Sequence, residues 1–138
     1  MEVFFYGLFM DISILSKNGI SPSNPRRGFV EDYTLKIGNR ASLIPRAGER
    51  AHGIIMTVSD AEIHGLYDEA SVADYIPEEV NVITDDVQSV KAVCYNLPED
   101  SLTGTNEAYA RSLLELGELL GLPPDYLKQI KEIVNGRV

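Results

Sequence analysis

The sequence predicts an α+β domain in which five or six strands precede a pair of helices. Up to residue 97 the apolar segments are short, several alternate with polar residues, and Gly, Pro, Asn and Asp separate them. From Leu113 onward the apolar residues recur at intervals of three and four, which is the spacing of one helix face. Strands followed by helices, without regular alternation of the two, are typical of the α+β class.

Length and composition place residues 1–138 in a single globular domain. The 138 residues are 44% apolar and 24% charged, which is ordinary for such a domain. The single cysteine, Cys94, fits a reducing compartment. No secretory leader pattern is present, and no apolar stretch approaches the roughly 18 residues that span a bilayer. We therefore expect a soluble, cytoplasmic protein without a membrane partner.

The charge is unevenly distributed along the chain. The net charge is −9, yet residues 1–58 carry seven Lys or Arg against five Asp or Glu, whereas residues 59–138 carry five against sixteen. An acidic chain is repelled by phosphate backbones, so nucleic acid is not an expected partner. The acidic half is interpreted as a solvated surface, while a small anionic ligand stays compatible with the N-terminal half.

The N-terminal quarter is expected to contain two strands and a short helix. Residues 2–6 are typical of a buried strand, and the Gly that follows marks a bulge, a sharp turn or a close approach of the backbone to a ligand. A helical stretch follows at Ile12–Leu15. Residues 17–28, rich in Pro, Gly, Asn and Ser, are predicted to form a loop, and the pattern of residues 29–37 indicates a strand.

Two strands and a helix are predicted next. Residues 41–45 and 51–58 are interpreted as strands joined by a turn at Ala47–Gly48. The Ser and Glu of the sequence SDAE at 59–62 have the spacing of a capping box, which begins a short helix through Leu66.

Two further strands are predicted at residues 75–83 and 87–97, separated by a turn at Asp85–Asp86. Pro77 has no backbone N–H to donate to a sheet. The first of these strands is therefore expected to lie at an edge or to contain a bulge.

The last part of the chain is predicted to form two helices. Leu113, Leu116 and Leu120 recur at helical spacing, and Gly121 suits the position just after a helix C-terminus. The prolines at 123–124 suit the first turn of a second helix. Its apolar side consists of Leu127, Ile130, Ile133 and Val134.

Most familiar catalytic motifs are absent from the sequence. It contains neither a phosphate-binding loop of the G-x-x-x-x-G-K-[ST] type nor G-x-G-x-x-G, and no Ser lies in a nucleophile elbow. His52 and His64 have no second His four residues away, so they are interpreted as surface or core histidines and no metal site is predicted. Cys94 lies in an apolar strand and is expected to be an inert buried thiol.

Glu69 occupies an unusual position for a carboxylate. It follows the predicted short helix, at the end where the helix dipole favours a cation. This placement is slightly unfavourable, so it is a weak indication that Glu69 serves a purpose other than stability.

Four stretches, taken in order, resemble the γ-glutamylcyclotransferase-like family, also called AIG2-like or BtrG-like. FFYGLFMD resembles the family's N-terminal Tyr-Gly loop, and residues 48–82, with HGLYDEASVADY at their centre, resemble its strand, short helix and Tyr-headed strand. VKAVCYNL matches the strand that usually ends in Tyr, and residues 106–133 resemble the C-terminal helical pair with its G-L-P-x-x-Y joint. The resemblance implies a small mixed β-barrel of five or six strands with flanking helices and a pocket at one mouth.

The resemblance also implies an activity. Members of this family cyclise a γ-glutamyl amine or γ-glutamyl amino acid to 5-oxoproline and release the amine, without a cofactor or metal. The substrate's own α-amine attacks its γ-carbonyl, so a carboxylate must first deprotonate the ammonium and then protonate the leaving amine. Glu69 aligns with the family's general acid/base.

The remaining site residues are carried over from the same motifs. Gly7, Leu8 and Phe9 would present backbone N–H groups to the substrate's carboxylate or to the developing oxyanion, while Tyr6 lines the pocket. Tyr75 aligns with a family tyrosine beside the base and would position the glutamyl group.

Three departures from the family pattern leave an alternative open. Leu8 replaces the usual Ser or Thr, Phe9 replaces Asn or Leu, and Ala70 replaces the Gly after the catalytic glutamate. The alternative is a catalytically inactive member that binds a small ligand or a protein partner through the same pocket. A Glu69 side chain inside a water-filled pocket would favour the enzyme, and a pocket filled by Leu8 or Phe9 would favour the binding protein. Arg40, just before a predicted inward-facing strand, is a further candidate for ligand contact.

Overall fold

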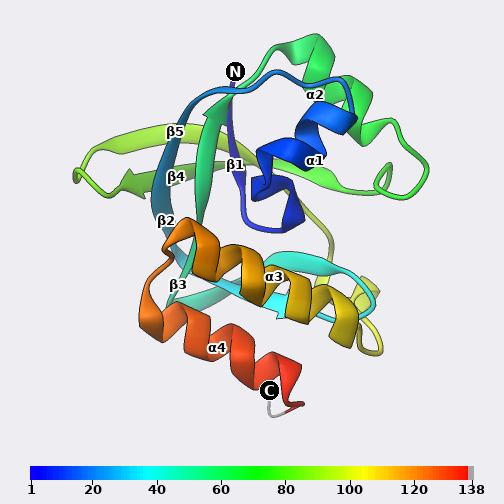
Figure 1. Cartoon of the computed structure of the whole chain (residues 1–138), viewed down its shortest axis with the longest axis vertical. Helices are drawn as coiled ribbons and strands as arrows, with labels where there is room; N and C mark the ends of the chain where they lie inside the picture. Colours follow the sequence, from blue (N-terminus) through cyan, green and yellow to red (C-terminus); the bar gives the residue numbers. More distant parts are fainter. Residues whose placement is uncertain (137–138) are drawn as a thin grey trace.

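The apolar segments of the sequence form five strands that close into a β-barrel. In the computed structural model, which describes residues 1–136, the strands follow the order β1-β3-β2-β4-β5 around the barrel (Figure 1). A parallel pair, with Val3 opposite Val93, joins β1 to β5, and the other pairs are antiparallel. The strands are β1 (Glu2–Phe5), β2 (Ser23–Ile37), β3 (Ala41–Thr57), β4 (Ile76–Thr84) and β5 (Ser89–Asn96). The predicted α+β barrel is therefore confirmed.

Helices flank the barrel at two ends of the molecule. The C-terminal helices α3 and α4 lie side by side at one end, and α1 and α2 lie near the other (Figure 1). The helical elements are η1 (Leu8–Met10), α1 (Ile12–Lys17), α2 (Asp60–Tyr67), η2 (Glu99–Ser101), α3 (Glu107–Leu120) and α4 (Pro124–Val134).

The prediction of a loop over residues 17–28 is wrong in its second half, because β2 already begins at Ser23. The pairing of β2 with β3 shifts register between Ser23 and Arg26. This irregularity accommodates Pro25, which has no N–H, and Asn24, whose φ is 53°. The turn-forming residues thus mark a bulge inside a strand.

The predicted turn at Ala47–Gly48 is also wrong, because β3 continues through it as one strand. Tyr33 pairs with Pro45 and Glu31 pairs with Arg50, so the residues between Pro45 and Arg50 oppose Asp32 alone. The N–H of Gly48 donates a hydrogen bond to Asp32 Oδ1 at 3.0 Å, and Gly48 has a φ of 82°. The glycine therefore bends the β2–β3 ribbon instead of reversing the chain.

Three predicted helix termini are confirmed, namely the start of α2, the end of α3 and the start of α4. The Ser59 Oγ accepts from the Glu62 N–H at 3.1 Å, and the Glu62 carboxylate accepts from the Ser59 N–H at 3.2 Å, which completes the capping box. At the end of α3, Gly121 adopts the left-handed conformation with a φ of 71°, and α4 starts at Pro124.

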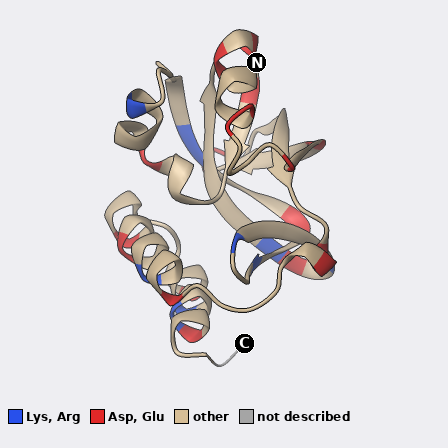
Figure 2. Ribbon diagram, turned by 90° about the vertical axis from the view of Figure 1, so that its right-hand side faces the viewer, with Lys and Arg blue, Asp and Glu red and all other residues tan. Residues whose placement is uncertain are grey.

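The N-terminal apolar run is buried as predicted, with Val3, Phe4 and Phe5 at most 2% exposed. The prediction that the strand with Pro77 lies at an edge or contains a bulge is wrong, because β4 pairs with both β2 and β5 in the closed barrel and its register with β5 is unbroken. Pro77 is tolerated because it is exposed at the start of β4, away from Ile83 and Thr84, where β4 pairs with β2. Acidic residues lie on α2, α3 and α4 (Figure 2). None of the acidic side chains between residues 59 and 138 is buried, so the acidic half is a solvated surface.

Candidate functional site

A pocket of about 270 Å³ lies where the end of β1, the start of β3, the end of α2 and the first turn of α3 meet. Among residues 1–136, no charged side chain lines it. The lining consists of Phe4, Phe5, Tyr6, Gly7, Leu8, Phe9, Ile14, Ala41, Tyr67, Val72, Tyr75 and Tyr109. The structure thus brings together Tyr6, Gly7, Leu8, Phe9 and Tyr75, which are five of the six predicted site residues.

Aromatic rings in contact with one another form much of the pocket wall. Tyr67 stacks on Tyr95 with centroids 3.9 Å apart and also contacts the rings of Phe9 and Tyr75, each at 6.1 Å. Phe9 lies edge-on against Phe5 at 6.3 Å. Such pairs stabilise their relative positions beyond simple burial, so the apolar wall is largely pre-formed.

Gly7 leaves space for the hydroxyl group of Tyr109. A β-carbon at Gly7 would overlap the Tyr109 Oη. The backbone of Gly7 has a φ of −108°, which any residue can adopt, so space and not conformation requires glycine here. The close approach predicted from the Tyr-Gly pair is therefore an approach to a side chain of α3.

The hydroxyl groups of two predicted site tyrosines are bonded to the barrel. Tyr6 Oη donates to the carbonyl of Tyr95 at 2.7 Å, and Tyr75 Oη donates to the carbonyl of Ala41 at 2.7 Å. Burial raises the pKa of both phenols, so both are neutral donors at physiological pH. These bonds fix the two rings as parts of the pocket wall.

The loop after β1 carries the predicted backbone donors. The N–H of Leu8 donates to Tyr109 Oη at 3.3 Å. The N–H groups of Gly7 and Phe9 have no acceptor within the part of the chain that the structure describes. Leu8 and Phe9 both line the pocket, where the family pattern has smaller or more polar residues. One predicted donor is therefore occupied by a protein hydroxyl, and two are open.

Glu69 lies outside this pocket. It follows α2 in a turn where its carbonyl oxygen accepts the N–H of Val72 at 3.0 Å, and the residue is exposed. Its neighbours Tyr67 and Val72 line the pocket, but Glu69 does not. Its role as general acid/base stays a prediction.

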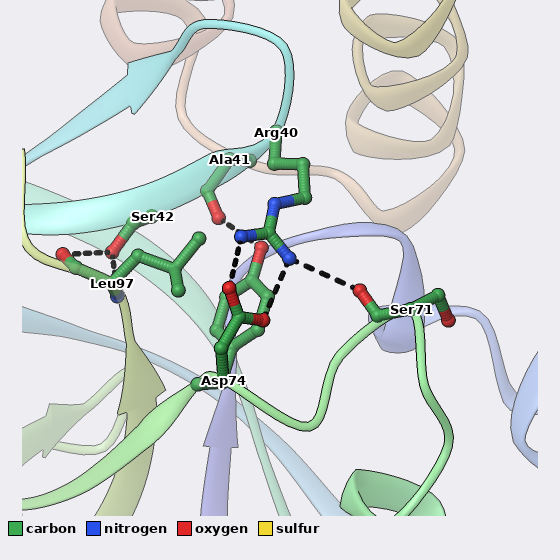
Figure 3. A network of polar contacts seen from close by, with 7 residues as sticks. Arg40, Ala41, Ser42, Ser71, Asp74 and Leu97 are labelled. Carbon is green, nitrogen blue, oxygen red and sulfur yellow. Dashed lines mark hydrogen bonds and ion pairs between the residues drawn. The ribbon is translucent and has the colours of Figure 1, made fainter. Parts of the chain in front are cut away.

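Arg40 fixes the segment that leads from Glu69 to Tyr75, although it does not line the pocket. Figure 3 shows its guanidinium reaching Asp74 and Ser71. Nη1 donates to Asp74 Oδ1 at 2.8 Å and to the carbonyl of Ser71 at 3.1 Å, and Nη2 donates to Asp74 Oδ2 at 2.5 Å. The guanidinium carbon also lies 5.4 Å from the centroid of the Tyr75 ring. Arg40 therefore positions one wall of the pocket.

The histidines and the cysteine agree with their structural interpretation. His52 lies between the rings of Phe29 and Tyr126, at 5.5 and 4.9 Å, and burial lowers its pKa. His64 is exposed. Cys94 is buried, and burial raises the pKa of its thiol, which makes it unreactive.

Two of the tyrosines that line the pocket, Tyr67 and Tyr109, were not among the predicted site residues. Tyr109 lies four residues before Leu113, on the apolar face of α3. This spacing predicts that the Tyr109 side chain points to the same side of the helix as that of Leu113. No local pattern indicates that its hydroxyl reaches Leu8, 101 residues away. Tyr67 lies two residues before Glu69, in a motif whose resemblance to the family assigns a role to the carboxylate and none to Tyr67.

The fold and the site together define a small α+β barrel with an aromatic pocket at the Tyr-Gly loop. No family profile matches the sequence, and no curated protein matches it either. Among the described residues, no helix is long and apolar enough to cross a membrane.

Comparison with solved structures identifies the fold. The chain is similar to a structure described as gamma-glutamyl cyclotransferase, with a TM-score of 0.76 and 16% identity over 95% of this chain and 86% of that one. It is also similar to YkqA from Bacillus subtilis, with a TM-score of 0.76 and 19% identity over 98% of this chain and 54% of YkqA. An AIG2-like protein from Mus musculus matches with a TM-score of 0.59 and 19% identity over 76% of this chain and 84% of that one. The chain thus has the γ-glutamylcyclotransferase-like fold that its motifs predicted.

Proposed function

We propose that this chain binds a small, neutral and largely apolar molecule in the pocket beside the Tyr-Gly loop. The observation that carries the proposal is the lining, which is aromatic and aliphatic and includes no charged side chain among residues 1–136. Apolar ligands gain free energy from burial against such a wall. A γ-glutamyl group instead carries an ammonium and a carboxylate, and burying unpaired charges is unfavourable.

The apolar residues at the loop support the same proposal. Leu8 and Phe9, which depart from the family pattern, extend the apolar wall and leave no side-chain hydroxyl at their positions. Glu69, the predicted base, is exposed outside the lining. General acid/base catalysis needs the carboxylate within hydrogen-bond reach of the reacting amine. Binding without cyclisation is therefore the proposal that agrees best with the geometry.

A second candidate is the cyclisation of a γ-glutamyl compound to 5-oxoproline with Glu69 as the base. Two observations favour it. Glu69 is three residues from Val72, which lines the pocket, so a small change in the turn would bring the carboxylate closer. The open N–H groups of Gly7 and Phe9 are suitable donors for a substrate carboxylate.

One experiment separates the two candidates. The ¹⁵N-labelled protein is titrated with neutral aromatic probes and with γ-glutamyl amines, γ-glutamyl amino acids and glutathione, and 5-oxoproline release is followed by mass spectrometry. We expect the neutral probes to shift the amides of pocket residues, and no 5-oxoproline to form. Release by the wild type that is lost in Glu69→Gln and retained in Glu118→Gln, an exposed control on α3, would overturn the proposal in favour of the enzyme.

A further inference from the structure

A second hollow, of about 670 Å³, lies between the bent β2–β3 ribbon and the C-terminal helices. It shares no lining residue with the pocket beside the Tyr-Gly loop. Figure 1 shows that α4 ends on the side of the molecule where α3 begins. The first turn of α3, the last two turns of α4 and residues 34–38 all contribute to the lining. We call this hollow the α4 groove.

The α4 groove has an excess of negative charge. Among residues 1–136, four acidic and two basic side chains line it, namely Glu49, Glu99, Glu107, Glu132, Lys36 and Arg46. Both basic side chains already pair with a glutamate of the groove, Lys36 with Glu99 at 3.2 Å and Arg46 with Glu49 at 3.8 Å. The lining therefore offers no unpaired cation to an anion, and its charge favours a cationic ligand.

Glu132 is the carboxylate of the groove that is free to bind a ligand. Glu107 pairs with Arg111 at 2.5 Å, whereas Glu132 forms no ion pair with any residue between 1 and 136. The Glu132 side chain is partly buried in the last turn of α4, where the helix dipole favours a cation. An ammonium group is therefore the natural partner of Glu132.

Thr34 and Gln129 present a donor and an acceptor that no described residue satisfies. Gln129 Nε2 donates to Thr34 Oγ1 at 3.1 Å, and both residues line the groove. Thr34 is only 5% exposed, yet its hydroxyl proton has no acceptor among residues 1–136, and Gln129 Oε1 has no donor there. Because unpaired buried polar groups are unfavourable, this pair favours a ligand group that both accepts and donates a hydrogen bond. A hydroxyl group does both.

The free carboxylate and the Thr34–Gln129 pair lie close together. Gln129 and Glu132 are three residues apart on α4, a spacing that places both side chains on the same side of the helix. The groups that they bind must therefore be neighbours in the ligand. Ile133 and Val134, both partly buried, add apolar surface to the lining, against which an alkyl chain gains free energy.

We propose that the α4 groove binds an aliphatic amino alcohol whose amino and hydroxyl groups are on adjacent carbon atoms. The ammonium group pairs with the Glu132 carboxylate. The hydroxyl group accepts the Thr34 proton and donates its own to Gln129 Oε1, while the alkyl chain packs against Ile133 and Val134. This site does not depend on the proposed function, because the two hollows have no residue in common.

The test uses three probes with the same six-carbon chain. They are 2-aminohexan-1-ol, hexan-2-amine, which lacks the hydroxyl group, and hexane-1,2-diol, in which a hydroxyl replaces the amino group. Each is titrated into the ¹⁵N-labelled full chain at about 150 mM salt, which screens weak attraction between the amines and the acidic surface. We expect 2-aminohexan-1-ol to shift the amides of Gln129 and Glu132. Hexan-2-amine should bind about threefold more weakly and hexane-1,2-diol about fivefold more weakly.

Three variants complete the design. Glu132→Gln should weaken both amines about fivefold and leave hexane-1,2-diol within about twofold. Thr34→Val replaces the hydroxyl by a methyl group, so it should weaken 2-aminohexan-1-ol about threefold and leave hexan-2-amine within about twofold. Glu118→Gln, which removes an exposed carboxylate of α3 outside the groove, should leave all three affinities unchanged. The ¹H–¹⁵N spectra verify that each variant is folded, and the probe comparison in the wild type tests the hydroxyl without any variant.

Four outcomes would overturn this inference. The first is equal affinity of the wild type for 2-aminohexan-1-ol and hexane-1,2-diol, and the second is an unchanged affinity for the amines in Glu132→Gln. Equal affinities for 2-aminohexan-1-ol and hexan-2-amine would exclude recognition of the hydroxyl group. Amide shifts spread over the acidic surface, or confined to Leu8, Phe9 and Val72, would place the probes outside the groove. None of these results bears on the binding of neutral aromatic probes, so the proposed function is tested separately.

Discussion

The guanidinium of Arg40 binds both carboxylate oxygens of Asp74 and, through Nη1, the carbonyl oxygen of Ser71. Arg40 belongs to the β2–β3 turn, whereas its two partners belong to the segment between α2 and β4. The next residue, Ala41, accepts the hydroxyl of Tyr75 from the same segment. One end of the β2–β3 ribbon thus holds a pocket wall by contacts from two successive residues.

Removal of this contact should loosen the wall. In Arg40→Ala we expect faster hydrogen exchange at the amides of Val72 and Tyr75, because their remaining bonds are local ones within the turn. Binding of the neutral probes should weaken in parallel, since both residues line the pocket. Arg111→Ala, which breaks an ion pair with Glu107 on α3, is the matched control. Equal exchange at Val72 in the two variants would contradict the positioning role of Arg40.

Tyr6 should contribute to stability through its hydroxyl group. Tyr6→Phe leaves the carbonyl of Tyr95 without its 2.7 Å partner in a buried setting. We expect the free energy of unfolding in urea to fall by about 1–2 kcal/mol, because an unsatisfied buried acceptor is unfavourable. The exposed Tyr33–Glu78 bond offers a comparison, and Tyr33→Phe should change stability by less than about 0.5 kcal/mol. Equal losses of unfolding free energy in Tyr6→Phe and Tyr33→Phe would contradict the expectation that burial makes the Tyr6 hydrogen bond more stabilising.

Glu62 should make stability depend on acidic pH. Its carboxylate accepts the N–H of Ser21 at 2.7 Å and that of Ser59 at 3.2 Å, and these bonds hold its pKa below the usual range of a glutamate. Because the folded pKa is below the unfolded one, the stabilisation is complete above about pH 5 and is lost as the pH falls through the folded pKa.

Urea unfolding between pH 7 and pH 3 tests this expectation. Glu62→Gln should be less stable than the wild type near neutrality, and the difference should shrink steadily below about pH 4.5. A difference that stays constant across the range would show that the charge of Glu62 is not involved.

The sequence predicted the fold well wherever neighbouring residues decide the structure. Ser59 and Glu62 cap a helix through bonds between residues three apart, and Gly121 ends another through its own backbone conformation. The bend at Gly48 was not predictable in the same way. A glycine with positive φ suits both a reversing turn and a bulge, and only the pairing of β3 with β2 across the bend decides between them.

The candidate site was predictable in its location but not in its contacts. The Tyr-Gly pair and Tyr75 indicated which segments meet, and they do line one pocket. The contact of Gly7 with Tyr109 joins residues that are remote in the chain, and it depends on how α3 docks on the barrel. The exposed position of Glu69 is a further consequence of the path of one turn, for which the sequence contains no local signal.

The place of β1 in the barrel has a consequence for synthesis on the ribosome. The residues Val3, Phe4 and Phe5 are synthesised before all of their strand partners, because the antiparallel partners of β1 are residues 54–57 and its parallel partner is Val93. This apolar segment stays unpaired until β3 has been synthesised. The barrel closes only after β5 has been synthesised as well. Such non-local pairing slows folding and prolongs the exposure of strand edges. The growing chain therefore exposes unpaired apolar strand edges until β5 has been synthesised.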